Sequence, residues 1–391
     1  MAGEVITLYA GQQPPESWDA CIFIGGFMPM PGSAATSWQL EVITLLQERW
    51  MGEGRLAVFV HEPGSCVHDV AADELIGWHG HALDVADVMM FWWPDDTDPC
   101  LMFTSLAAWN DNHRAVHGTP SESTLRSYLA KYAGKRAIST VTTLADLVNT
   151  ALDKIGTGAR RAAGEREVPL TVWRTDSFQR WYSAQTAAGN TLLGARQVWT
   201  FSAGPHQRFL FYWALHVRMY VRSEDRVKSN EVVISRPDIS VMALYQRGAS
   251  MDETVVVLVR EFRSPASTPD GLVHELPGGS ETAETGALDQ AVRETEEETG
   301  LAIDAQRIRA HGDRQLAATV SAHHAHLFAA EITNEELAWL RASQATPHGR
   351  GDTERTWPEI TTFGELRKDR LVDWATLGMI AEAVFDKSSL P

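Results

Sequence analysis

The stretch from residue 278 to residue 301 constrains this chain most, because it joins a glycine turn to a predicted helix that ends in a dense run of glutamates. Residues 293–300 read Arg-Glu-Thr-Glu-Glu-Glu-Thr-Gly. Positions three or four apart share one helix face, so Glu294, Glu297 and Glu298 are expected on one side, where their charges repel. A hard divalent cation would relieve this repulsion, and magnesium prefers oxygen ligands.

A run of charges more commonly marks a solvated helix face. Here the glycine turn, the helix and a Thr299-Gly300 stop occur together in one order, which favours a built site. Gly279 permits close approach of the backbone, and its carbonyl can add an oxygen ligand. We therefore predict a magnesium site, with manganese as the alternative ion, at Gly279, Glu294, Glu297 and Glu298.

The same stretch resembles the Nudix box, the loop-helix signature of Nudix hydrolases, in Gly279, in the RExxEExG core and in the interval between them. Thr285 stands where the family has its first glutamate, and Thr295 replaces a bulky aliphatic residue. The resemblance implies a Nudix α/β/α sandwich with magnesium on the central carboxylates. It also implies hydrolysis of the diphosphate bond in a nucleoside diphosphate derivative, with ADP-ribose or a related dinucleotide favoured.

Three residues outside the box are further site candidates. Arg260 and Arg263 follow a predicted strand at 254–259, where two guanidinium groups can bind a diphosphate. They also match positions at which Nudix enzymes acting on ADP-ribose-like substrates hold their ligand, although a solvated arginine pair is an equal alternative. Glu354, in a polar loop, is the candidate general base, and Glu298 and Glu294 of the box are the competing catalytic carboxylates.

Composition limits the classes of function. A 391-residue chain that is 44% hydrophobic and 22% charged is typical of a soluble globular protein with two or three domains. A formal net charge of −17 argues against binding to nucleic acid or an anionic membrane. The three cysteines form no CxxC motif, and neither a signal peptide nor an apolar run of membrane-spanning length is present. We therefore expect a cytoplasmic protein with a nucleotide as its small-molecule substrate.

The first part of the chain predicts a flavodoxin-like parallel α/β domain over residues 1–135, because buried strands at 21–24, 56–60 and 87–94 alternate with helices at 38–50 and 74–86. Gly25 and Gly26 follow the first strand, where a ligand loop is expected. The glycine loop and the ALDVADVMMFWWP segment resemble the nucleoside 2-deoxyribosyltransferase-like family.

That family uses a glutamate nucleophile on the helix after the third strand, and Ala108 aligns with it here. The resemblance therefore leaves two readings of the first domain. It either binds a nucleotide or nucleoside without transferase chemistry, or another acid carries out the reaction. The acids available for this are Glu41, Glu62, Asp95, Asp96 and Asp98.

A helix at 143–155 and a mobile connector near 156–166 make residues 136–166 the predicted linker. Residues 167–391 then form the predicted Nudix domain with a β-rich extension, which is either an extra sheet or an arm that forms a homodimer. The whole chain is predicted to be a diphosphatase; the alternatives are a bifunctional enzyme that also cleaves an N-glycosidic bond, and a nucleotide sensor without catalysis. Strands are expected in the extension at 169–173, 197–201, 209–213, 217–221 and 231–234.

Overall fold

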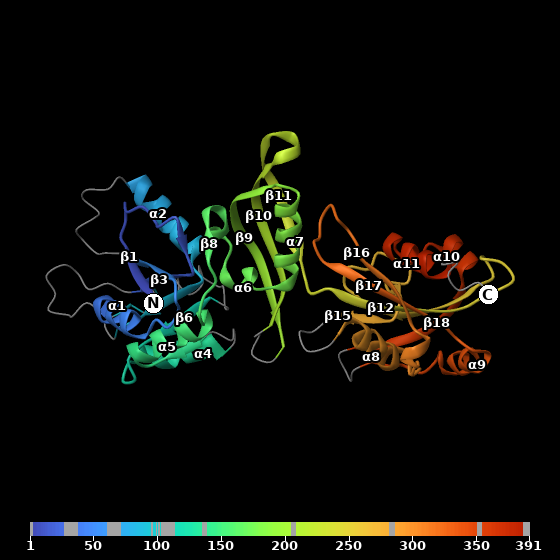
Figure 1. Cartoon of the computed structure of the whole chain (residues 1–391). Helices are drawn as coiled ribbons and strands as arrows, with labels where there is room; N and C mark the ends of the chain where they lie inside the picture. The colour runs from blue at the N-terminus through green and yellow to red at the C-terminus, as the bar shows by residue number, and fades with distance from the viewer. Residues whose placement is uncertain are drawn as a thin grey trace. The chain divides into compact units, whose positions relative to one another are not determined.

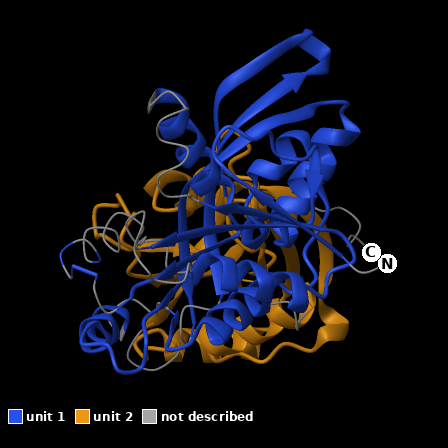
Figure 2. Cartoon of the chain, turned by 90° about the vertical axis from the view of Figure 1, so that its left-hand side faces the viewer, with its two compact units in different colours: residues 1–234 blue, residues 235–391 orange. Residues whose placement is uncertain are grey.

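The chain is a mixed α/β protein with two compact units, residues 1–234 and 235–391, in a computed structural model (Figure 2). None of the helices within the described ranges is both long and apolar enough to cross a membrane. The structure describes residues 3–26, 38–60, 72–94, 97, 98, 100, 102, 114–134, 139–204, 209–280, 286–349 and 354–385.

Unit 1 begins with a six-stranded sheet in which every neighbouring pair is parallel, in the order β1-β4-β3-β5-β6-β7. The central strands are almost entirely buried, as continuous apolar runs in a parallel sheet require. The predicted strands at 21–24, 56–60 and 87–94 are confirmed. The strands are β1 (Glu4–Leu8), β3 (Ala20–Gly26), β4 (Arg55–Val60), β5 (Val88–Trp92), β6 (Ala115–Gly118) and β7 (Ser139–Val141).

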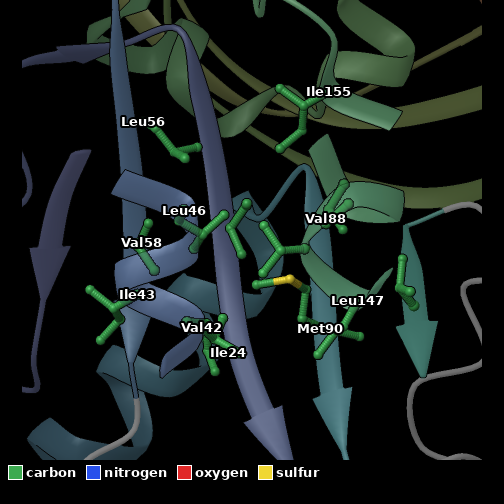
Figure 3. Close-up of a cluster of buried hydrophobic side chains, with 14 of the residues drawn as sticks. Ile24, Val42, Ile43, Leu46, Leu56, Val58, Val88, Met90, Leu147 and Ile155 are labelled. Carbon is green, nitrogen blue, oxygen red and sulfur yellow. The ribbon is translucent and has the colours of Figure 1, made fainter. Parts of the chain in front are cut away.

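Helices pack on this sheet through two apolar clusters. In one of them, strand residues Ile24, Val58 and Met90 meet Leu46 and Leu147 from two helices (Figure 3). The other cluster includes residues of α2 and α4. The helices are α1 (Trp38–Arg49), α2 (Ala72–Val85), α4 (Leu125–Gly134) and α5 (Leu144–Ile155).

The segment predicted as a mobile connector is part of the core of unit 1. Strand β8 (Arg161–Ala162) pairs with β2 (Ser17–Trp18), and the side chain of Arg161 is fully buried. Its guanidinium donates to Asp87 Oδ1 at 2.8 Å, and the same carboxylate accepts from the backbone N–H groups of Cys21 and Leu170. Small residues made 156–166 resemble a linker, but this long-range ion pair fixes the segment.

The β-rich extension is a three-stranded antiparallel sheet, and it groups with unit 1; its use as a homodimer arm stays a prediction. The predicted strand at 169–173 is instead a short helix, and the strands predicted at 209–213 and 217–221 are one continuous strand. The elements are α6 (Leu170–Trp173), α7 (Asp176–Ala187), β9 (Thr191–Ala203), β10 (Phe209–Val221) and β11 (Arg226–Ser235).

Unit 2 is built on a mixed seven-stranded sheet with the path β14-β13-β12-β17-β16, to which β15 adds by pairing with β12 and β18 by pairing with β13. Neighbouring residues of strand β12 face opposite sides of the sheet. Met242 therefore belongs to the apolar cluster beneath helix α8 (Ala287–Thr299), and Val241 belongs to the cluster beneath helix α11 (Trp374–Phe385). The strands are β12 (Ile239–Gln246), β13 (Val255–Glu261), β14 (Val273–Glu275), β15 (Gly278–Ser280), β16 (Arg309–Gln315), β17 (His324–Glu331) and β18 (Thr356–Thr362).

Helices cover both faces of this second sheet. Figure 1 shows α8 and α9 on one side of it and α10 and α11 on the other, in agreement with the two apolar clusters. The predicted box helix is therefore confirmed as a helix. The bounds of these helices are α8 (Ala287–Thr299), α9 (Asn334–Ser343), α10 (Phe363–Asp369) and α11 (Trp374–Phe385).

Candidate functional site

The glycine turn of the box lies directly against α8. It forms β15, which pairs with the start of β12 (Figure 1). A Cβ on Gly279 would lie 2.6 Å from Cδ of Glu294, so a larger residue would displace that carboxylate. A Cβ on Gly278 would lie 2.5 Å from the carbonyl oxygen of Ser240. Gly279 therefore allows the Glu294 carboxylate to approach the turn closely, and Gly278 allows the turn to pair closely with β12.

Glu298 is a buried carboxylate on this helix. Its Oε2 accepts a hydrogen bond from the backbone N–H of Gly278 at 2.9 Å. Burial raises the pKa of Glu298 well above its usual range, and the hydrogen bond from Gly278 opposes this. The negative charges of Glu275, Glu294 and Glu261 raise the pKa of Glu298 further. Several carboxylates therefore meet at this point.

Glu294 and Glu297 lie on the same helix. The Glu294 carboxylate accepts from Nε2 of Gln290 at 2.6 Å and lies 3.5 Å from Arg293. The carbonyl oxygen of Glu297 accepts from the backbone N–H of Gly349 at 3.0 Å. That second bond holds the loop before β18 beside α8.

Two glutamates that no motif indicates, Glu261 and Glu275, also belong to the site. They end the paired strands β13 and β14. Glu261 is only 3% exposed, and its pKa is raised to about 7, first by burial, against which the guanidinium of Arg263 acts. The charge of Glu275 adds to the rise, and burial raises the pKa of Glu275 itself. We call Glu261, Glu275, Glu294 and Glu298 the carboxylate cluster.

Arg263 and Glu354, predicted separately as a phosphate ligand and a base, lie together beside this cluster. Nη2 of Arg263 is 3.6 Å from Oε1 of Glu354, and its Nε is 4.0 Å from Oε1 of Glu275. The same guanidinium contacts the carboxylate of Glu261. Arg263 is about half exposed, so it can exchange one of these partners for a ligand phosphate.

Arg260 is placed differently. Along β13, Val257 faces α8 and Leu258 faces α11, so by strand alternation Glu261 faces α8 and Arg260 does not. The Arg260 side chain is exposed on that other face. The structure thus brings Arg263, but not Arg260, to the carboxylate cluster.

The carboxylate cluster fits magnesium in its chemistry, because it offers only oxygen ligands. Burial is the largest cause that raises the pKa values of Glu261, Glu275 and Glu298, and the charges of neighbouring carboxylates add to it; a divalent cation would offset this repulsion. Within the described ranges, no three His, Cys, Asp or Glu side chains already stand in a geometry that could hold an ion. Side-chain rotation, such as that of Glu294 away from Gln290, would be needed.

In unit 1, Gly25 and Gly26 end β3 at the carboxyl edge of the parallel sheet, where ligands bind in open α/β folds. Gly26 has φ +123°, and a Cβ there would lie 2.3 Å from the carbonyl oxygen of Trp92. Of the alternative acids, Glu41 and Asp98 are exposed. Ala108, Glu62, Asp95 and Asp96 lie outside the described residues.

Comparison with known proteins adds no family assignment. No protein-family model matches the chain, and no curated protein matches it either.

Proposed function

We propose that unit 2 is a magnesium-dependent Nudix-type hydrolase that splits the diphosphate bond of a nucleoside diphosphate derivative, with ADP-ribose or a related dinucleotide favoured. The observation that carries this proposal is the carboxylate cluster, in which the box carboxylates Glu294 and Glu298 are joined by Glu261 and Glu275. A solvated acidic helix would not bury Glu298 against a glycine turn. The sheet with helices on both faces also supports a Nudix α/β/α sandwich.

Each residue of the site has a separate role in the proposed hydrolysis. When bound, magnesium would offset the negative charge on the phosphate oxygens during attack by water. Arg263 binds a phosphate through its guanidinium, because it lies at the exposed edge of the cluster. Glu354, beside Arg263, accepts the proton of the attacking water, and Glu298 is the competing base. Gly278 positions Glu298 through its backbone N–H.

Unit 1 is proposed to bind the nucleotide or nucleoside part of a ligand as a flavodoxin-like domain. Counted from β3, the order β4-β3-β5-β6-β7 corresponds to 2-1-3-4-5, the order of flavodoxin-like sheets, with β1 added at one edge. Gly25 and Gly26 lie at the edge where such sheets hold their ligands. This arrangement supports the resemblance to nucleoside 2-deoxyribosyltransferases.

The test of the diphosphatase is hydrolysis of ADP-ribose, NAD, nucleoside triphosphates and nucleotide sugars by the full chain with magnesium. Glu298→Gln should lower the rate roughly a hundredfold or more, as loss of one key electrostatic group does. Glu296→Gln is the matched control, because Glu296 is exposed on the same helix. If no compound is cleaved while nucleotides still raise the melting temperature, the sensor alternative replaces the enzyme.

The bifunctional alternative needs a separate readout. The Glu298→Gln chain, silenced in unit 2, is incubated with nucleosides, nucleotides and NAD, and free base is measured by chromatography. Steady release of base would establish N-glycosidic cleavage in unit 1. Binding without release would support a domain that only binds.

A further inference from the structure

A pocket opens in unit 2 on the face of the sheet away from α8. It has a volume of about 230 Å³ and lies between β16, β17 and α11. Leu327, which lines it, belongs to the apolar cluster beneath α11, whereas Glu294 and Glu298 lie on α8. The sheet therefore separates this pocket from the carboxylate cluster.

Gly378 gives the first sign that the pocket is kept open. It lies inside α11, where glycine costs about 1 kcal/mol relative to alanine. A Cβ at Gly378 would meet no atom within 4 Å, so close packing does not explain the glycine. Ala325 and Ala375, also small, line the same space. Gly378 is itself exposed, so these small residues leave the pocket open to solvent beside α11.

Trp374 gives the second sign. This first residue of α11 lines the pocket and is 88% exposed, which leaves a large apolar ring in water. No ring contact of Trp374 occurs within the part of the chain that the structure describes. An indole face at the mouth of a pocket is a stacking surface for a planar ligand.

The polar groups around the pocket define what such a ligand must offer. Arg314 and Glu382 line it from β16 and α11, and neither forms an ion pair among the described residues. Gln315 donates its Nε2 to the carbonyl oxygen of Ser321, which leaves its own side-chain oxygen as an acceptor. The pocket therefore presents both donors and acceptors around an apolar floor. An aliphatic ligand would leave these groups unused.

We propose that this pocket is a second ligand site, which binds a planar nitrogen heterocycle such as a purine base. The heterocycle stacks on Trp374 and forms hydrogen bonds with Arg314 and Glu382. Cavities of about 150 Å³ accept benzene, so a pocket of about 230 Å³ is large enough for a two-ring base. The site does not depend on the diphosphatase proposal, since it lies on the other face of the sheet.

The test is hydrogen–deuterium exchange of the full chain with adenine, and with cyclohexanol as an aliphatic control. Adenine is expected to slow exchange in residues 311–316 and 374–382. Gly378→Leu fills the pocket and should weaken this protection at least about tenfold; leucine is also the better helix former. Gly77→Leu is the matched control, because Gly77 lies in α2 with the same open space around it. Trp374→Ala should weaken protection about tenfold through lost stacking.

Three results would overturn the proposal: no protection by adenine, equal protection by cyclohexanol, or unchanged protection in Gly378→Leu. The Glu298→Gln chain should keep the protection, since Glu298 is not part of this pocket. If the original chain binds adenine but hydrolyses no diphosphate compound, the result counts against the diphosphatase alone. If the original chain hydrolyses a diphosphate compound but binds no adenine, the result counts against the second site alone.

Discussion

Glu261 should make unit 2 less stable as the pH rises. Its pKa is raised from 4.5 to about 7 in the folded chain, mainly by burial. The folded state therefore holds a proton that the unfolded state has lost, so stability falls between about pH 4.5 and pH 7. A pKa that rises from 4.5 to about 7 would correspond to about 3.4 kcal/mol. The charges of Glu275 and Glu354 also raise this pKa, and their side chains are 42% and 34% exposed, so solvent screening reduces our expectation to about 1–2 kcal/mol.

Glu261→Gln removes this titration. In urea unfolding with EDTA at pH 5, 6, 7 and 8, the variant should match the original chain at pH 5 and exceed its free energy of unfolding by about 1–2 kcal/mol at pH 8. Glu296→Gln, on an exposed glutamate, should follow the original chain at every pH. A difference between Glu261→Gln and the original chain that stays constant across this range would refute the reasoning.

Three further changes follow from the described contacts. Arg161→Ala leaves the Asp87 carboxylate buried and unpaired, so thermal unfolding should show a loss of about 3–5 kcal/mol; an effect below about 1 kcal/mol would contradict the buried ion pair. Gly279→Ala places a methyl group against the Glu294 carboxylate, so hydrolysis should fall about tenfold or more while circular dichroism keeps its melting curve; full activity would show that this approach is not needed. Leu46→Ala empties a fully buried position between α1 and the parallel sheet and should cost about 2–5 kcal/mol in denaturant unfolding, more than the same change at the exposed Leu40.

The sequence was sufficient for elements with strong local patterns. The apolar runs of β3, β4 and β5 indicated buried parallel strands, and the box helix ends at the predicted stop, Gly300, which has φ 74°. The segment at 169–173 misled the prediction because Thr171 and Val172 favour strands, yet α6 packs its apolar side into the cluster that holds Trp213. Tertiary packing overrode local propensity in those four residues.

The candidate site could be predicted only in part. Glu294 and Glu298 follow from spacing on one helix, but Glu261 and Glu275 come from strands that no motif marks. Counting alternate residues from Val257 would have placed Glu261 on the face of α8, so that signal was present. Nothing in the sequence indicates that Glu275 lies beside Glu261, because their proximity depends on the register of the antiparallel strands β13 and β14.

The buried ion pair of Arg161 and Asp87 also sets the order in which unit 1 can be completed during synthesis. All six parallel strands have left the ribosome once residue 141 is free, but the Asp87 carboxylate, directly before β5, still lacks its counter-charge. It gains that charge only when residue 161 emerges, and its last backbone donor only with Leu170. A nascent chain with all six strands therefore cannot neutralise the Asp87 carboxylate until the segment that contains Arg161 emerges. That segment is the one predicted from the sequence as a connector.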